Sequence, residues 1–383
     1  MKLRLPGPTT RYDLTLLAVV TALLAIGLAM VYSASGIRAL DTLDDPRYFL
    51  VQQSVWVGIG FVAMLIVARI DYHRYRVVAA VAIAVALVLL VAVLLPGVGT
   101  RVGGASRWLR VSSFAGIQPT ELAKLALVLY GAQLLAARPR MVGTIRTVVP
   151  YLAVVGLGCL LMVAEPDLGT AIVVCLAAAA LLVAAGMKIR HLMLLAAGLG
   201  VVLLLAIAIE PYRMQRLTGF LNPTGDPTGI GFQAIQAKIA LGSGGIFGVG
   251  LGQSLQKAFY LPEAHTDMIA AVIGEELGLM GISVLVGLYG LFGFAGLRTA
   301  QRARDRYGKL LAAGLTSLVL IQAIVNLFAV LGLAPLTGVP LPFVSYGNSS
   351  LLVMLAATGL LLNVARDGRC ETAGRRRRPG RAT

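Results

Sequence analysis

The residues best suited to chemistry stand where a polar stretch meets a long apolar run. The stretch reads "YLPEAHTDMIAAVIGEELG", residues 260–278, and it places His265, Thr266 and Asp267 directly before the apolar residues. A carboxylate there can accept a proton from an attacking hydroxyl group. The second interpretation of Asp267 is an ordinary helix N-cap, which bonds the free backbone N–H groups of the first turn. We expect His265 and Thr266 to be supporting contacts.

Two more carboxylates, Glu275 and Glu276, follow within the same run. On a helix they lie about 12 Å deeper than Asp267 and point roughly 100° apart. We therefore expect at most one of them to face the same cavity as Asp267.

A second ionisable pair lies inside another apolar run, "QPTELAKLALVLY". Glu121 and Lys124 are three residues apart, so on a helix they share a face and can neutralise each other. A structural ion pair and a role in binding substrate are both open, and the two are compatible.

A basic and aromatic group lies in the loop at residues 96–116, where Arg107 precedes Trp108. Such a set suits the headgroup level of a membrane, and we interpret Trp108 as an interfacial anchor. A contact of Trp108 with a ligand is the alternative.

The elements that must position these residues are membrane-spanning helices. The chain has 383 residues, of which 58% are hydrophobic and 13% charged, which is too apolar for a wetted surface. Runs of about 20 apolar residues are long enough to cross the hydrocarbon layer. The ten runs are 14–34, 50–69, 76–95, 117–137, 147–164, 168–186, 191–209, 268–297, 310–332 and 346–365. Short connections between most of them predict one all-α polytopic helical bundle.

The basic residues test this arrangement, because cytoplasmic loops carry the excess of lysine and arginine. Ten spans place both termini on one side. Segments on that presumed inner side hold 23 of the 33 lysines and arginines, the outer segments hold 9, and Lys124 lies within a span. We therefore expect both termini in the cytoplasm. We attribute the net charge of +16 mainly to the basic residues that flank the membrane spans.

One outer loop, residues 210–267, is much longer than the others, and such a loop is typically functional or disordered. Its stretch "IGFQAIQAKIALG" predicts a short amphipathic or re-entrant helix, and the glycine-rich "GSGGIFGVGLGQS" follows. The glycines suit tight packing of a re-entrant segment, with cradling of a phosphate as the alternative.

Other kinds of site have little support. Cys159 and Cys175 fall in spans and Cys370 in the inner tail, so no outer pair forms a disulfide framework. No serine, cysteine or threonine has the spacing of a nucleophile elbow or triad.

Five motifs in order, "GASRWLRV", "QPTELAKLALV", "EPDLGTA", "GSGGIFGVGLGQSLQKAFYLPEAHTDMIAAVIGEELG" and "GVPLPFVSYGNSS", resemble the SEDS family (shape, elongation, division and sporulation). The sequence around Asp267 resembles the division members of the family more than the elongation members. The resemblance covers residues 14–366, within a predicted membrane domain at 1–366 that is followed by a basic cytoplasmic tail at 367–383.

The resemblance implies a peptidoglycan glycosyltransferase that polymerises lipid II on the outer face of the cytoplasmic membrane during cell division. It implies a class B penicillin-binding protein as partner, among other division proteins, and it places the essential aspartate of the family at Asp267. The glutamate and lysine of its fourth helix fall on Glu121 and Lys124.

These expectations define a mechanism. Asp267 accepts the proton of the acceptor 4-hydroxyl group, and undecaprenyl pyrophosphate leaves. Lys124, Arg107 or a divalent cation (Mg or Mn) stabilises the leaving charge. The alternatives are a lipid II flippase, which needs charges at mid-depth in several spans, and a non-catalytic division scaffold, in which Asp267 is dispensable.

Overall fold

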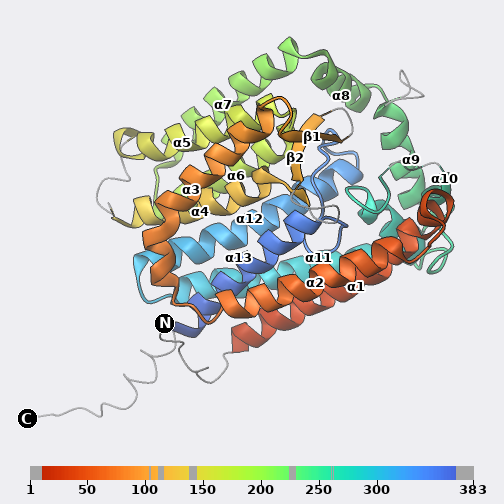
Figure 1. Cartoon of the computed structure of the whole chain (residues 1–383), viewed down its shortest axis with the longest axis horizontal. Coiled ribbons are helices and arrows are strands. Elements are labelled where there is room, and N and C mark those ends of the chain that lie inside the picture. Colours follow the sequence, from red (N-terminus) through yellow and green to blue (C-terminus); the bar gives the residue numbers. More distant parts are fainter. Residues whose placement is uncertain are drawn as a thin grey trace, which may run out of the picture.

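Long helices run through nearly the whole chain in the computed structural model, which describes residues 11–102, 105–110, 116–137, 145–223, 230–259, 261 and 263–367 (Figure 1). The long helices are α1 (Arg11–Leu43), α2 (Tyr48–Val67), α3 (Tyr72–Leu94), α4 (Pro119–Ala137), α5 (Ile145–Ala164), α6 (Leu168–Ala185), α7 (Ile189–Ile209), α11 (Ile269–Arg302), α12 (Arg306–Val330) and α13 (Asn348–Asp367). Three shorter helices lie between α7 and α11: α8 (Pro211–Leu221), α9 (Ile230–Ser243) and α10 (Gln256–Phe259).

Each predicted span coincides with one of the long helices. Within the described residues, nine are long and apolar enough to cross a membrane. The tenth, α5, has a shorter apolar part that begins at Val148. The predicted fold class, an all-α polytopic membrane protein, is confirmed.

Polar residues at the membrane surfaces set several helix ends. Asp71 accepts a hydrogen bond from the His73 amide at the start of α3, and Asp167 accepts one from the Thr170 amide at the start of α6. Asp305 caps α12 in the same way. These side chains satisfy backbone donors that have no partner within the helix.

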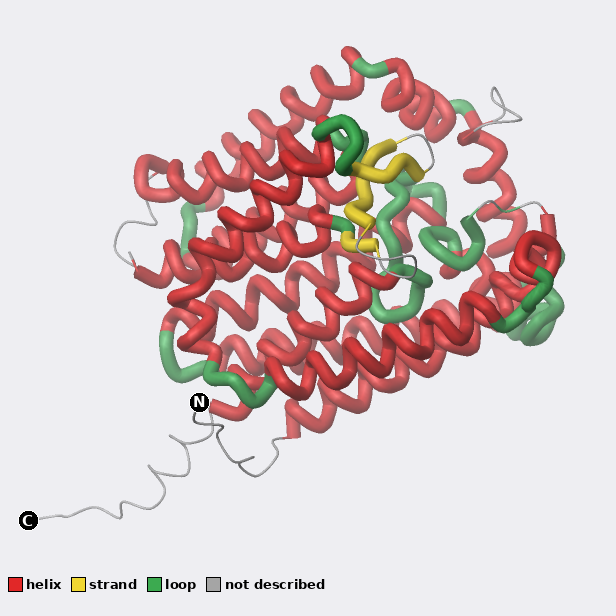
Figure 2. The backbone as a smooth tube through the Cα atoms, in the orientation of Figure 1, coloured by secondary structure: helices red, strands yellow, loops and turns green. Residues whose placement is uncertain are grey.

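Helix α12 lies at the centre of the bundle. It packs against α4, α6, α11 and α13, while α1 packs on α11 and α2 on α13 (Figure 2). The two described ends of the chain meet at one end of the bundle, where Arg366 Nε lies 3.9 Å from Asp13 Oδ2. An even number of crossings requires this arrangement.

The segment at residues 331–347, between α12 and α13, is not helical. Its residues 341–345 are buried, and side chains of α11 and α12 bind its backbone. Gln322 donates to the Pro340 carbonyl, Tyr289 to Pro342 and Asn326 to Val339. Irregular backbone is tolerated at membrane depth only when protein groups satisfy it in this way.

The 96–116 loop differs from the all-helical expectation. It contains a small antiparallel sheet of β1 (Gly99–Val102), β2 (Ala105–Arg110) and β3 (Gly116–Ile117), in the order β1-β2-β3. The Trp108 ring covers Gly116, where a Cβ would lie 3.1 Å from the ring. Residues 103–104 and 111–115 lie outside the described residues.

The predicted helix in the long outer loop is α9, and the glycine-rich stretch after it packs tightly on α11. Val249 and Gly250 donate to the carbonyl oxygens of Glu275 and Glu276. A Cβ on Gly248 would clash with the Glu276 carbonyl oxygen. Helix α11 is interrupted at the same level by Gly278, whose φ of 65° suits glycine. The packing interpretation is confirmed for Gly244 and Gly248, where a Cβ would overlap carbonyl oxygens of α11.

Candidate functional site

Asp267 lies in the turn before α11 rather than at its cap. The N-cap residue is Met268, and it makes no side-chain capping hydrogen bond. The N-cap interpretation of Asp267 is therefore wrong. Its backbone carbonyl is held by Asn326 of α12, whose Nδ2 donates to it at 2.7 Å and to the Val339 carbonyl at 2.8 Å. This clamp fixes the carboxylate without using its oxygens.

The surroundings of Asp267 make it a stronger base than an exposed aspartate. Burial raises the pKa of Asp267 to about 6, and the Glu263 carboxylate adds to the rise. A hydrogen bond from Thr266 and the positive charge of Arg216 act in the opposite direction. A general base works best with a pKa near the operating pH.

Thr266 and His265 support this turn in different ways. The Thr266 hydroxyl lies 3.3 Å from Asp267 Oδ1 and 3.1 Å from Glu263 Oε2, so it can donate to either carboxylate. Burial lowers the pKa of His265 to about 4, against the opposing charge of Glu263, so the ring is neutral near pH 7. The ring packs against Phe49 and Tyr346, with centroids 4.8 and 5.5 Å away. These contacts make it a packing residue.

The predicted pair in α4 is a buried ion pair. Lys124 Nζ lies 2.8 Å from Glu121 Oε1, and both side chains are at most 1% exposed. Lys124 also donates to Gln322 Oε1 of α12 at 2.6 Å. Glu121 Oε2 is buried and has no hydrogen-bond partner among the described residues, so this oxygen could still accept a hydrogen bond. The structural role is confirmed, and the ammonium group is engaged with protein.

Two residues of α12 link this ion pair to Asp267. Gln322 and Asn326 are four residues apart, so they lie on one helix face, one turn from each other. Gln322 contacts Lys124 and the Pro340 carbonyl, and Asn326 contacts the Val339 carbonyl and the Asp267 backbone. The structure thus brings Asp267 and Lys124 to neighbouring positions along α12.

Arg107 lies on β2 and binds the junction of α5 and α6. Its Nε donates to the Glu165 carbonyl at 3.1 Å, and its Nη2 donates to the Pro166 carbonyl. The Glu165 side chain is 1% exposed, and its oxygens have no hydrogen-bond partner among the described residues. Burial raises the pKa of Glu165 to about 8, with Asp167 adding to the rise, so it is mostly protonated near pH 7.

Glu275 and Glu276 face other elements. Glu275 accepts from the Ser254 hydroxyl and from the Leu255 amide. Glu276 pairs with Lys257 at 2.6 Å and accepts from Ser33 of α1. Both therefore fix the outer loop, and no described contact joins either to Asp267.

Sequence reasoning missed Arg216, Gln322 and Asn326. Arg216 of α8 donates to the Leu336 carbonyl at 3.0 Å, and its charge acts on Asp267. A nearly closed cavity of about 10 Å³ is lined by Arg216 and Lys238 among others. The spacing of Gln322 and Asn326 inside an apolar helix was a usable signal, because amides are uncommon on a lipid-facing surface.

The described residues include no group of three or more His, Cys, Asp or Glu side chains that could hold a metal ion. The divalent cation stays a prediction, and we derive no step through a metal. Cys159 and Cys175 are free thiols whose sulfur atoms lie 3.4 Å apart in α5 and α6. Cys370 and the basic tail lie outside the described residues.

Comparison with known proteins extends these observations. A family model described as cell cycle protein, for FtsW, RodA and SpoVE, matches residues 14–369. The probable peptidoglycan glycosyltransferase FtsW of Trichlorobacter lovleyi is 42% identical over 95% of either chain. Stage V sporulation protein E of Bacillus subtilis is 42% identical over 94% of this chain and 98% of its own.

Solved structures agree in fold. A chain from work on the structural coordination of polymerization and crosslinking by a peptidoglycan synthase complex has a TM-score of 0.77 and 32% identity. That alignment covers 94% of this chain and 99% of the other. The rod shape determining protein RodA of Thermus thermophilus has a TM-score of 0.69 and 28% identity, with 94% and 98% covered.

Proposed function

The chain belongs to the FtsW/RodA/SpoVE family of cell cycle proteins, and from that membership we propose that it is a peptidoglycan glycosyltransferase. Relatives that it matches over nearly its whole length carry that name. Its substrate is lipid II, and polymerisation takes place on the outer face of the cytoplasmic membrane. The observation that carries the proposal is Asp267, a carboxylate clamped through its backbone by Asn326 and given a raised pKa by burial.

The reaction joins two sugars and releases a pyrophosphate. The acceptor 4-hydroxyl oxygen attacks the anomeric carbon of the donor, and Asp267 takes the hydroxyl proton. The bond from that carbon to the pyrophosphate oxygen breaks, and undecaprenyl pyrophosphate leaves with the electron pair. This leaving group needs its charge stabilised more than it needs a proton, so one carboxylate suffices where glycoside hydrolysis requires two.

The leaving charge is stabilised by cationic side chains at the outer end of the bundle. Arg216 is the best candidate, because its charge already acts on Asp267. Arg107 lies on the outer sheet and orders the α5–α6 junction. Lys124 is buried between Glu121 and Gln322, so we assign it to holding α4 against α12 and not to the pyrophosphate.

The chain is a multi-pass membrane protein, and we place both termini in the cytoplasm and the chain at the division site. We propose a class B penicillin-binding protein, a transpeptidase, as its partner. A structural relative from a peptidoglycan synthase complex that coordinates polymerization and crosslinking supports this choice.

The test is polymerisation of purified lipid II by Asp267→Asn, with the partner protein present. Asparagine has the same shape but cannot accept the proton, and the Asn326 clamp holds only the backbone of residue 267. We expect glycan synthesis to fall by about 100-fold or more, while the protein stays folded and bound to its partner.

Glu263→Gln is the matched control, because it makes the same change four residues earlier on an exposed carboxylate. We expect it to retain activity. Normal polymerisation by Asp267→Asn would show that Asp267 is not the base and that the base lies elsewhere in the chain.

A further inference from the structure

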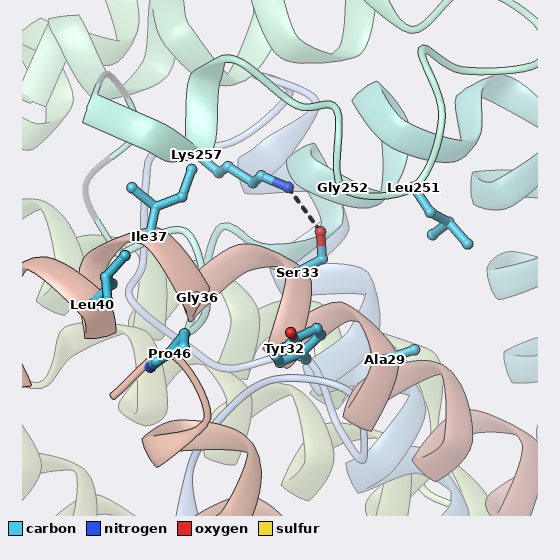
Figure 3. A pocket seen from close by; sticks show the side chains of 10 residues that line it. All are labelled: Ala29, Tyr32, Ser33, Gly36, Ile37, Leu40, Pro46, Leu251, Gly252 and Lys257. Carbon is cyan, nitrogen blue, oxygen red and sulfur yellow. Dashed lines mark hydrogen bonds between the residues drawn. The ribbon is translucent and has the colours of Figure 1, made fainter. Parts of the chain in front are cut away.

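A cavity of about 570 Å³ opens between the outer part of α1 and residues 251–257, which lead into α10 (Figure 3). Its walls are mainly apolar and include Ala29, Ile37, Leu40 and Leu251. Its polar side chains are Tyr32, Ser33 and Lys257. The volume falls within the usual range of ligand sites. The residues of the Asp267 turn are not among those that line it.

The polar end of the cavity is formed by Lys257, which is the positive member of a buried ion pair with Glu276. Lys257 is 7% exposed, and its Nζ lies 2.6 Å from Glu276 Oε1 and 2.9 Å from Ser33 Oγ. Glu276 is 0% exposed and does not line the cavity. An ammonium group has three donors, so one N–H of Lys257 has no partner among the described residues. The cavity therefore offers a hydrogen-bond donor and positive potential to an anionic oxygen.

The depth of the cavity matches that of lipid headgroups. Asp13 pairs with Arg366 at the inner end of α1, and Ser33 is 20 residues further along the helix. That separation corresponds to about 30 Å, the thickness of the hydrocarbon layer. Lys257 hence lies near the outer boundary of this layer, and the phosphates of the outer leaflet lie just beyond it.

We propose that this cavity binds a phospholipid of the outer leaflet. A phosphate oxygen accepts a hydrogen bond from the remaining N–H of Lys257, and one acyl chain lies against the apolar wall of α1. Lipid of the bilayer covers this surface, since the apolar side chains of Leu40 and Leu251 beside the cavity are 55% and 64% exposed. The site is independent of the reaction at Asp267 and goes beyond the proposed function. A lipid bound in this cavity would contact both α1 and the segment that precedes the Asp267 turn.

The test fills the cavity without touching the ion pair. Gly36 lines the cavity, and a Cβ there would meet only the Pro46 carbonyl oxygen at 3.9 Å, so Gly36→Leu places its side chain in the cavity. Gly58→Leu on α2 is the matched control, because nothing lies within 4 Å of its Cβ position. Ala29→Phe is a second filling variant, should Gly36→Leu fail to fold.

The full-length protein is purified in mild detergent, supplied with phosphatidylglycerol, and then passed through a delipidating detergent exchange. Native mass spectrometry counts and identifies the retained lipid. We expect one phospholipid on the wild type and on Gly58→Leu, with at least tenfold less on the filling variants. The double variant Lys257→Gln/Glu276→Gln keeps neutral partners in the buried pair, and we expect about tenfold weaker retention of phosphatidylglycerol.

Three results would overturn the proposal. They are no retained lipid on the wild type, equal retention on folded Gly36→Leu or Ala29→Phe, or a retained species whose mass is that of a polyprenyl phosphate. The last result would assign the cavity to the substrate carrier instead. Loss of activity in Asp267→Asn has no bearing on these measurements, so the two proposals fail separately.

Discussion

At the scale of single residues, the site depends on one carboxylate whose environment is set from several elements. Burial, and then the charge of Glu263, raise the pKa of Asp267, whereas the charge of Arg216 lowers it. Its own oxygens contact Thr266, while Asn326 holds its backbone. A base held in this way keeps its lone pairs available for a substrate hydroxyl.

The pKa of Asp267 predicts the pH dependence of polymerisation. The ionised form is the base, and the pKa is about 6. We expect kcat/KM to rise about tenfold per pH unit below pH 6 and to level off above it. Initial rates of lipid II polymerisation between pH 4.5 and 8 measure this profile.

Arg216→Gln provides the control for that assignment. Removing a positive charge that lowers the pKa of Asp267 shifts the inflection to higher pH, whereas Glu263→Gln shifts it to lower pH. An inflection that stays fixed in both variants would contradict Asp267 as the titrating group.

At the scale of elements, α11 and the glycine-rich segment form one packed unit. The Val249 and Gly250 amides bond the α11 backbone, and the Leu279 and Met280 amides bond the carbonyl oxygens of Gly245 and Ile246. Ser254 and Lys257 then bind Glu275 and Glu276 through side chains. This unit leads directly into the Asp267 turn, so its packing determines where the base lies.

Gly248→Ala tests this packing. The residue has a φ of 81°, and a Cβ would overlap the Glu276 carbonyl oxygen, so both the backbone and the contact must shift. We expect a loss of roughly 2–4 kcal/mol in stability, seen as a lower melting temperature, together with reduced polymerisation.

Gly242→Ala is the matched substitution for that test. Gly242 lies inside α9 with nothing within 4 Å of its Cβ position, and alanine there is expected to be neutral or to stabilise by about 0.5–1 kcal/mol. Equal melting temperatures for the two variants would contradict the close packing of Gly248 on α11.

At the scale of the whole molecule, the ten long helices place the two described ends on one side and the Asp267 turn towards the other. The surface between them is largely apolar where α2, α3 and α7 are exposed. Buried polar groups gather along α12 and at the ends of the helices. A lipid-linked substrate can therefore approach from the membrane while the reacting groups stay at the outer end.

The orientation of the molecule is testable by cysteine labelling in a variant without native cysteines. Val98 and Arg74 are exposed residues at opposite ends of α3. We expect a membrane-impermeant maleimide to label Val98→Cys in intact spheroplasts and Arg74→Cys only after lysis. The reverse pattern would place Asp267 on the cytoplasmic side and exclude polymerisation on the outer face.

The sequence by itself determined the features that depend on local composition and spacing. Hydropathy over about 20 residues marks each crossing, because transfer into hydrocarbon is nearly additive along a helix. The Glu121–Lys124 pair follows from helix geometry, and the position of Asp267 beside a long apolar run indicated a reactive carboxylate. These inferences needed no knowledge of which helices are neighbours.

Only the tertiary structure decided which distant residues meet. Ser33 and Glu276 are separated by 243 residues, and Lys124 and Gln322 by 198, yet each pair forms a hydrogen bond. Helices in a bilayer associate through close packing and hydrogen bonds rather than through a hydrophobic difference from lipid. Such contacts leave no periodic pattern in the sequence. Hence the partners of Gln322, Asn326 and Lys257, and the burial of residues 341–345, emerged only from the fold.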